Sequence, residues 1–263
     1  MLIRVGGSNI YPLFCPFILI LEMILRSIEF KEKFLTLSNP EKLKVEFDPK
    51  LQFITGPNGY GKTTISDLIY QMILRNDIED RLKERVGWVC LTTDLGTITY
   101  DRQNGLQKNL SNNVVPQIYY KRQENNGFLP TPEEVQIIVN NEDIRKIISV
   151  WCDNREEPII DLRTGKLSMK YVHCNRIYPF NKASISIQNL VMMYLFAMET
   201  REGDILLLEH PEEHLHIEIQ LDLMRNLERL CKGQIIVTTH SPDIFQNYGF
   251  ERDQDLFSIS EKK

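Results

Sequence analysis

The stretch Gly56-Pro57-Asn58-Gly59-Tyr60-Gly61-Lys62-Thr63-Thr64 decides the fold of this chain. It fits the pattern of a glycine, four residues and Gly-Lys-Thr, and it stands between an apolar run, residues 51–54, and an amphipathic stretch, residues 65–74. Glycines let backbone N–H groups turn inward around a phosphate, and the positive end of the following helix faces the same anion. The alternative is a glycine-rich turn with a chance lysine, which the flanking strand and helix disfavour. The stretch predicts a nucleoside triphosphate site, with Lys62 supplying charge and Thr63 a hydroxyl for Mg²⁺.

Composition indicates an ordinary globular protein. A chain of 263 residues that is 42% hydrophobic can build one large domain or two small ones. The net charge of −5 argues against a uniformly basic surface, although Lys121-Arg122 or residues 75–85 leave room for local nucleic-acid contact. The five cysteines form no Cys-x-x-Cys pair, which disfavours a zinc ribbon or a disulfide framework. We therefore expect a cytoplasmic protein without a membrane partner.

The first residues resemble a signal-peptide core. The apolar run over residues 10–25 is too short to span a bilayer, Pro12, Pro16 and Glu22 interrupt it, and no small-residue cleavage site follows. We expect residues 1–22 to be an N-terminal extension, for which an upstream start codon is one origin, and residues 23–263 to form one domain. Intact-mass analysis of natively expressed protein tests this expectation.

Short strands and helices are predicted between the two ends of the chain. Residues 24–30 and 43–47 alternate as strands do, and residues 88–93, 96–101 and 117–120 predict further short strands. Helices are expected from Pro132 and over residues 143–151, followed by a hairpin within residues 159–172. We expect residues 86–180 to form one β-rich and helical lobe inserted in the core.

Two buried strands close the chain. Residues 205–208 are four apolar residues in succession, which is typical of a strand covered on both faces in a parallel sheet. Glu209-His210-Pro-Glu-Glu-His-Leu-His follows, then a helix near residues 218–231 and a second apolar strand ending in Thr-Thr-His240-Ser241. Polar residues at the carboxyl ends of parallel strands mark the usual ligand site of an open α/β sheet.

These motifs together resemble the nucleotide-binding domain shared by ABC transporters, SMC-like chromosome-maintenance and DNA-repair ATPases, and overcoming-lysogeny-defect proteins. The greatest likeness is to compact prokaryotic AAA-type ATPases of phage-defence and toxin–antitoxin-like operons. It covers roughly residues 24–245 and is weak over residues 86–179. The resemblance implies an α/β fold: a P-loop NTPase core, similar to the ABC ATPases, with an antiparallel β lobe and a small helical insertion.

The resemblance also implies roles at the strand ends. Glu209 stands at the Mg²⁺ position, where aspartate is commoner, and His240 matches a histidine that senses the γ-phosphate. His210 stands where a catalytic glutamate is usual. A neutral histidine can act as a base near pH 7, but an imidazolium beside Mg²⁺ is a poor one. Slow hydrolysis is therefore expected, or the use of Glu212 or Glu213 instead.

A signature helix in this family closes over the partner subunit's ATP. Ser184-Ile-Ser186-Ile-Gln-Asn occupies that place, with Ser186 where glycine is common. An ordinary serine-capped helix explains these residues equally well. The family also has a Q-loop glutamine, for which Gln117 and Gln123 are the two candidates in this chain.

Three other enzyme classes share part of these motifs. The residues from His210 to His214 also satisfy His-x-x-Glu-His of zinc peptidases, but that pattern needs both histidines on one helix. Asn181-Lys-Ala-Ser184 lacks the aspartate that a GTPase uses for guanine. A small-molecule kinase would explain the phosphate loop but not the two strand endings.

The sequence therefore predicts an ATPase that works as a head-to-tail homodimer around two ATP molecules with Mg²⁺ and controls a separate effector. That effector would be a nuclease or toxin subunit, since no nuclease motif is visible in the chain. The process it serves would be anti-phage defence or DNA maintenance. The alternative is an ATP-gated scaffold with little turnover.

Overall fold

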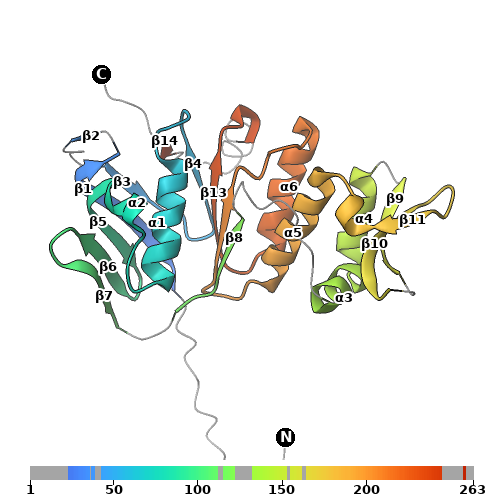
Figure 1. The fold of residues 1–263 in the computed structure, drawn as a ribbon, viewed down its shortest axis with the longest axis horizontal. Helices are drawn as coiled ribbons and strands as arrows, with labels where there is room; N and C mark the ends of the chain where they lie inside the picture. Colours follow the sequence, from blue (N-terminus) through green and yellow to red (C-terminus); the bar gives the residue numbers. More distant parts are fainter. Residues whose placement is uncertain are drawn as a thin grey trace, which may run out of the picture.

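Two sheets and a distal lobe make up the part of the chain that the structure describes. This computed structural model describes residues 23–35, 37–38, 43–111, 115–121, 132–152, 155–161, 164–244 and 257–258. The expected extension, residues 1–22, and Gln123 lie outside these residues. Figure 1 shows the antiparallel sheet at one end, the parallel sheet in the middle and the distal lobe at the other end.

The antiparallel sheet is built on β1 (Leu25–Phe34). On one side β1 pairs with β5 (Val86–Thr93), and then β6 (Gly96–Asp101) and β7 (Gly105–Leu110) follow as hairpins. On its other side β1 pairs with β3 (Leu43–Glu46) and β2 (Leu37–Ser38). The register of β1 against β5 shifts between Lys31 and Phe34, where Glu32 takes a positive φ of 66°. This bulge bends the end of β1, which carries Phe34 and leads into Leu35.

The central sheet is entirely parallel. Its order is β14 (Phe257–Ser258), β4 (Leu51–Thr55), β13 (Gln234–Thr239), β12 (Ile205–Glu209) and β8 (Ile118–Lys121). Alternate residues of β12 enter different cores: Ile205 and Leu207 belong to one cluster, Leu206 and Leu208 to the other. Burial on both faces explains the uninterrupted apolar run.

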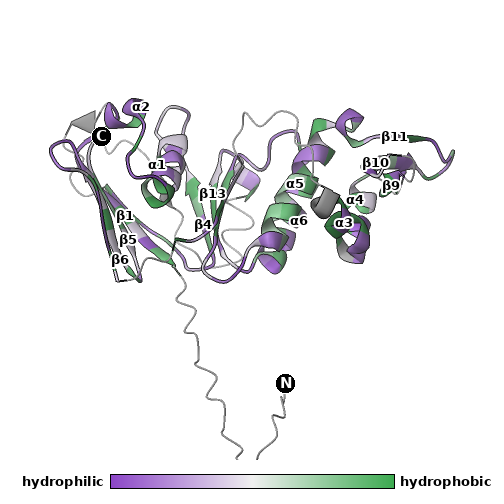
Figure 2. Cartoon of the chain, turned by 60° about the horizontal axis from the view of Figure 1, so that its bottom comes forward, coloured by the Kyte–Doolittle hydropathy of each residue, from purple (hydrophilic) through white to green (hydrophobic). Residues whose placement is uncertain are grey.

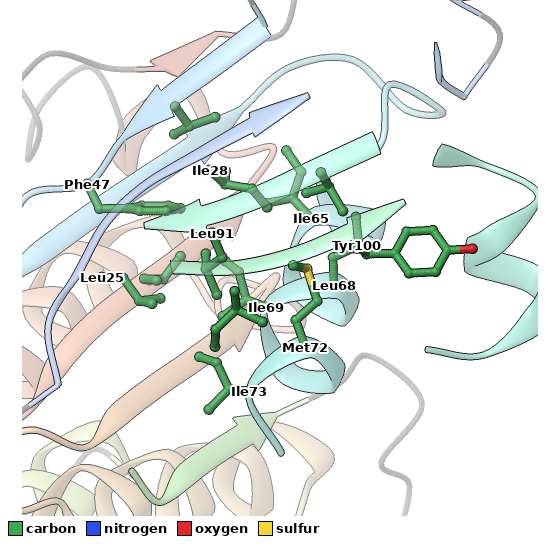
Figure 3. Close-up of a cluster of buried hydrophobic side chains, with 14 of the residues drawn as sticks. Leu25, Ile28, Phe47, Ile65, Leu68, Ile69, Met72, Ile73, Leu91 and Tyr100 are labelled. Carbon is green, nitrogen blue, oxygen red and sulfur yellow. The ribbon is translucent and has the colours of Figure 1, made fainter. Parts of the chain in front are cut away.

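Helix α1 (Lys62–Leu74) fills the space between the two sheets. Figure 3 shows Ile65, Leu68, Ile69 and Met72 of this helix beside Leu91 of β5. The short helix α2 (Asp80–Lys83) leads into β5. Gln234, which is buried, also ties the sheets together, because its side chain accepts from Leu25 N at 2.9 Å and donates to Leu25 O at 3.0 Å.

Two helices cover the other face of the parallel sheet. They are α5 (Ile185–Glu199) and α6 (Ile217–Leu230). Figure 2 shows α5 largely hydrophobic and α6 of mixed character, in agreement with their burial. The distal lobe beyond them contains α3 (Pro132–Asn140), α4 (Glu142–Trp151), β9 (Glu156–Asp161), β10 (Lys166–Tyr171), β11 (Ile177–Pro179) and the 3-10 helix η1 (Phe180–Lys182). No helix among the described residues is long and apolar enough to cross a bilayer.

The stretch over residues 86–180, expected as one lobe, is divided among three sheets. β5, β6 and β7 extend the antiparallel sheet, β8 joins the parallel sheet beside β12, and only β9, β10 and β11 form a sheet of their own. The expected strand at residues 117–120 is therefore core rather than lobe. Its parallel pairing with β12 supplies the physical reason, since Tyr119 lies opposite Leu206 of a strand that is buried on both faces.

Candidate functional site

Three neighbouring strands bring the predicted site together. β4, β13 and β12 are adjacent and parallel, so their carboxyl ends meet at one edge of the sheet. β4 ends at Thr55 and leads into the glycine-rich loop, β12 ends at Glu209, and His240 directly follows β13. Residues that are far apart in the sequence thus converge beside the loop.

The loop needs its glycines. Gly56, Gly59 and Gly61 have positive φ of 148°, 82° and 94°, a region that residues with a Cβ rarely adopt. A Cβ on Gly61 would also lie 2.6 Å from Phe34 Cζ and 2.7 Å from Leu35 Cδ1, whereas a Cβ on Gly59 would meet nothing within 4 Å. The bent end of β1 therefore packs directly against the point where α1 begins.

Lys62 reaches back over the loop. Its side chain is buried, and Nζ donates to Gly56 O at 2.7 Å and to Pro57 O at 2.9 Å. Burial lowers the pKa of the Lys62 ammonium, while the charges of Glu212 and Glu209 act in the opposite direction. The ammonium is thus held at the mouth of the loop, and phosphate oxygens could replace the two carbonyl acceptors.

Thr63 and Glu209, predicted as the Mg²⁺ ligands, are in direct contact. The Thr63 hydroxyl donates to Oε1 of Glu209, which is only 3% exposed at the end of β12. A hydroxyl and a carboxylate are the hard oxygen donors that Mg²⁺ prefers. The two side chains therefore fit a divalent cation at the edge of the loop.

His210, Glu212 and His240 form a compact cluster beyond Glu209. The rings of His210 and His240 stack with centroids 4.4 Å apart and planes 4° apart. His210 Nδ1 lies 3.5 Å from Glu212 Oε1, and the same oxygen accepts from the His240 backbone N–H at 2.9 Å. His210 takes a positive φ of 46°, and its N–H donates to Thr238 O at 2.9 Å. Glu213 donates its backbone N–H to His210 O at 3.2 Å.

Electrostatics favours a charged Glu212 and a neutral His240. Burial raises the pKa of Glu212, but hydrogen bonds from His210, the His240 N–H, its own backbone and Thr239 outweigh burial, so the net pKa is lowered. Burial lowers the pKa of His240, and Lys62 and His210 act in the same direction. The cluster thus favours a carboxylate at Glu212 and a neutral imidazole at His240 near pH 7.

A cavity of about 530 Å³ joins these groups, a size suited to a small ligand. Lys62, Thr63, Thr64, His210 and His240 line it, as do Asn58, Gly59 and Gly61. Pro57 and Tyr60 complete the loop, and Tyr60 packs against the core.

Three further residues line the cavity that the sequence did not single out: Leu35, Glu84 and Arg85. Arg85 Nη1 donates to Thr64 Oγ1 at 3.0 Å, which places a guanidinium beside the loop. The cluster of charged residues over 75–85, four basic and four acidic, was the only sequence signal. Pairing of β5 with β1 carries Arg85 here, since Leu35 N donates to Arg85 O at 2.7 Å.

The expected signature helix is α5, and both of its serines make hydrogen bonds within the chain. Ser184 is the N-cap and accepts from Ile187 N at 3.3 Å. Ser186 Oγ donates at 2.7 Å to the carbonyl of His214, in the segment that follows Glu209. Neither serine lines the cavity at the loop. The amino end of α5 is therefore tied to the segment that carries His210.

The geometry disagrees with three of the alternatives from the sequence. His210 and His214 lie in turns rather than on one helix, and no group of three His, Cys, Asp or Glu side chains among the described residues could hold a metal ion. Asn181 and Lys182 belong to η1 and line a different cavity, which leaves guanine recognition without support. Gln117 lies before the amino end of β8, where its N–H donates to Asp204 Oδ1, so it is remote from the ligand edge.

Sequence profiles give the family. The profile described as an AAA ATPase domain matches residues 98–245, more than half of the chain, and an AAA domain profile matches residues 32–150. The chain belongs to the AAA ATPase domain family. No curated protein matches it.

Solved structures agree with a P-loop ATPase fold. The SMC head domain from Thermotoga maritima is 17% identical, with a TM-score of 0.51 over 85% of this chain and 91% of its own. An SMC head bound to the C-winged helix domain of ScpA is 12% identical, with a TM-score of 0.55 over 85% of this chain and 91% of its own. An SMC head with an extended coiled coil, bound to the C-terminal domain of ScpA from Pyrococcus furiosus, is 12% identical. Its TM-score is 0.52 over 86% of this chain and 92% of its own.

Proposed function

We propose that this ATPase-family chain binds ATP in the cavity at the glycine-rich loop and hydrolyses it slowly. The convergence of Lys62 with the Thr63–Glu209 pair at that cavity carries the proposal. The backbone N–H groups of the loop and the amino end of α1 would hold the phosphates. Lys62 would exchange its two carbonyl acceptors for phosphate oxygens, and Arg85 would add a second positive charge.

Thr63 and Glu209 would hold Mg²⁺, which would neutralise phosphate charge when bound. Their contact in the structure supports this assignment, because it brings a hydroxyl and a carboxylate oxygen close enough to share one cation. Glu209 in place of aspartate keeps the same chemistry with a longer side chain. We further propose that residues 23–263 act as one ATPase domain.

His210 is proposed as the base, with Glu212 as the residue that positions it. Glu212 is not among the residues that line the cavity at the loop, whereas His210 is. Because Nδ1 of His210 faces Glu212, Nε2 is the nitrogen left to accept a proton from water on the cavity side. The stacked His240 ring restricts rotation of His210. A histidine–glutamate dyad would then stand in for the usual catalytic glutamate.

Dimerisation around ATP and control of an effector belong to the same proposal. Ile185 and Ile217 are about half exposed at the amino ends of α5 and α6, which offers apolar surface beside the site. SMC heads that share the fold were solved with ScpA bound. By analogy, a separate subunit, either nuclease or toxin, would read the nucleotide state in anti-phage defence or DNA maintenance.

One observation favours the second candidate, an ATP-gated scaffold without turnover. Ser186 is engaged by the His214 carbonyl instead of being available to a phosphate. A nucleotide bound across a dimer would have to break that contact, which would slow hydrolysis and favour a switch.

Single-turnover hydrolysis tests the dyad against the scaffold. We expect His210→Gln to lose activity about 10²–10⁴-fold, as for removal of a general base. Glu212→Gln should lower the rate without weakening ATP binding, and Glu212→Asp should restore part of it. Glu213→Gln is the matched control and should retain activity. Binding with dimerisation in light scattering but without turnover, and activity gained by His210→Glu, would instead establish the scaffold.

A further inference from the structure

A second cavity lies in the distal lobe, away from the phosphate loop. It has a volume of about 560 Å³ and is formed by α3, the β9–β10 hairpin, the end of β11 and η1. It shares no lining residue with the cavity that contains Lys62. The proposed function gives it no role.

One part of its lining is apolar. Val135 of α3, Leu167 of β10 and Phe180 of η1 line the cavity, and all three are almost fully buried. The same three side chains belong to the hydrophobic cluster beneath α5 and α6. The cavity therefore offers a fixed apolar surface to the body of a ligand.

A buried hydroxyl gives the cavity a polar point. Ser168 is only 3% exposed, lies on the central strand β10 and lines the cavity. Its cross-strand neighbours in the sheet are Ile159 and Pro179. A serine hydroxyl can both donate and accept, so it offers a hydrogen-bond partner to a polar atom of a ligand.

Two cations complete the lining. Lys166 and Lys182 are exposed and form no ion pair within the described part of the chain. Lys170 on the same strand differs, since it pairs with Glu157 at 3.2 Å. The one carboxylate in the lining, Asp161, accepts from Thr164 Oγ1 at 3.2 Å. An anionic group on a ligand would therefore meet two unpaired ammonium groups.

We propose that this cavity binds a small ligand with an apolar body and a single anionic group, a carboxylate or a phosphate. The body would contact Val135, Leu167 and Phe180, Ser168 would donate its hydroxyl, and Lys166 and Lys182 would hold the anion. The ligand acts as an effector of the ATPase, and this second statement rests on the proposed function.

The effector role follows from the connection to α5. Lys182 lies two residues before Ser184, the N-cap of that helix. Gln188 Nε2 donates to Ala183 O at 2.8 Å, and Ser186 Oγ donates to His214 O at 2.7 Å. A ligand packed against η1 would thus act on the amino end of α5 and on the segment that carries His210.

Octanoate and octan-1-ol are the matched probes, measured by titration calorimetry on the full chain without nucleotide. We expect saturable octanoate binding at one site per chain and weaker binding of the alcohol. The Lys166→Ala/Lys182→Ala variant should lose octanoate affinity about tenfold or more, the loss of one charge-assisted hydrogen bond. Lys170→Ala is the control and should bind as wild type does.

Ser168→Leu would fill the cavity and should abolish binding of both probes. If circular dichroism shows that it misfolds, Ser168→Ala replaces it and should weaken octanoate binding. Absence of saturable binding, or binding that is insensitive to the lysine and serine variants, would overturn the site.

ATP turnover tests the effector role separately. Saturating octanoate should change wild-type turnover at least twofold and leave the double-lysine variant unaffected. Binding with unchanged turnover would overturn the effector role. If the wild type shows no ATP turnover, the proposed hydrolysis is contradicted, but the calorimetry still shows whether the distal cavity binds octanoate.

Discussion

Replacing Gly61 and Gly59 separately by alanine measures the packing of β1 against the phosphate loop. Both glycines have positive φ, 94° and 82°, so alanine at either position costs roughly 1–2 kcal/mol of backbone strain. Only at position 61 does the new Cβ meet other atoms, at 2.6 Å from Phe34 Cζ. Phe34 is fully buried and the centroids of the Phe34 and Phe30 rings are 4.4 Å apart, so the packed ring has little room to change its rotamer.

Overpacking of this kind costs about 1–3 kcal/mol. We therefore expect Gly61→Ala to unfold with a free energy lower than that of Gly59→Ala by that amount, as measured by urea denaturation of both variants. ATP affinity should fall in both, because each alters the loop. Equal unfolding free energies for the two variants would refute the contact between Phe34 and the start of α1.

Three further predictions concern contacts between segments. Gln234→Ala removes the two hydrogen bonds to Leu25 that join the sheets, and it should lower the free energy of unfolding in urea by about 2–4 kcal/mol. Gln107→Ala, at an exposed position of β7, is the control and should leave that free energy nearly unchanged. The pKa of Glu212 is lowered in the folded state, so its carboxylate stabilises the fold at pH values above its ordinary pKa of 4.5, and this stabilisation is lost as the pH falls. In Glu212→Gln the free energy of unfolding, measured by urea denaturation, should therefore decrease less between neutral and acidic pH than in wild type. Ser186→Ala should cost about 1 kcal/mol of unfolding free energy, and no change would exclude a role for its bond in holding the segment after Glu209.

The core of the site could be predicted because local patterns encode it. Four apolar residues before Glu209 require a strand that is buried on both faces, and the glycine pattern requires a strand before it and a helix after it. Parallel strands place their carboxyl ends together, which brings Glu209, His210 and His240 to the loop. The prediction needed only order along the chain and the rules of parallel sheets.

The remaining features depend on pairings between distant segments. β8 has four residues, and only its pairing with β12, more than 80 residues later, assigns it to the central sheet. Arg85 and Leu35 reach the cavity because β5 pairs with β1 around a bulge, and no short motif records that register. The sequence left Ser184 and Ser186 between a signature helix and an ordinary serine-capped helix, and the bond from the Ser186 hydroxyl to the His214 carbonyl is set by how α5 packs.

ATP turnover by wild type and by Lys62→Ala, with Lys170→Ala on β10 as a control for a lysine outside the loop, tests the central claim most directly. The Lys62→Ala variant would lose at least one charge-assisted hydrogen bond to phosphate, so ATP affinity should fall about 10–100-fold and turnover at subsaturating ATP should fall by at least the same factor. Wild type and Lys170→Ala should hydrolyse ATP at equal, slow rates. Wild-type turnover that survives Lys62→Ala unchanged would contradict the assignment of the glycine-rich loop as the nucleotide site.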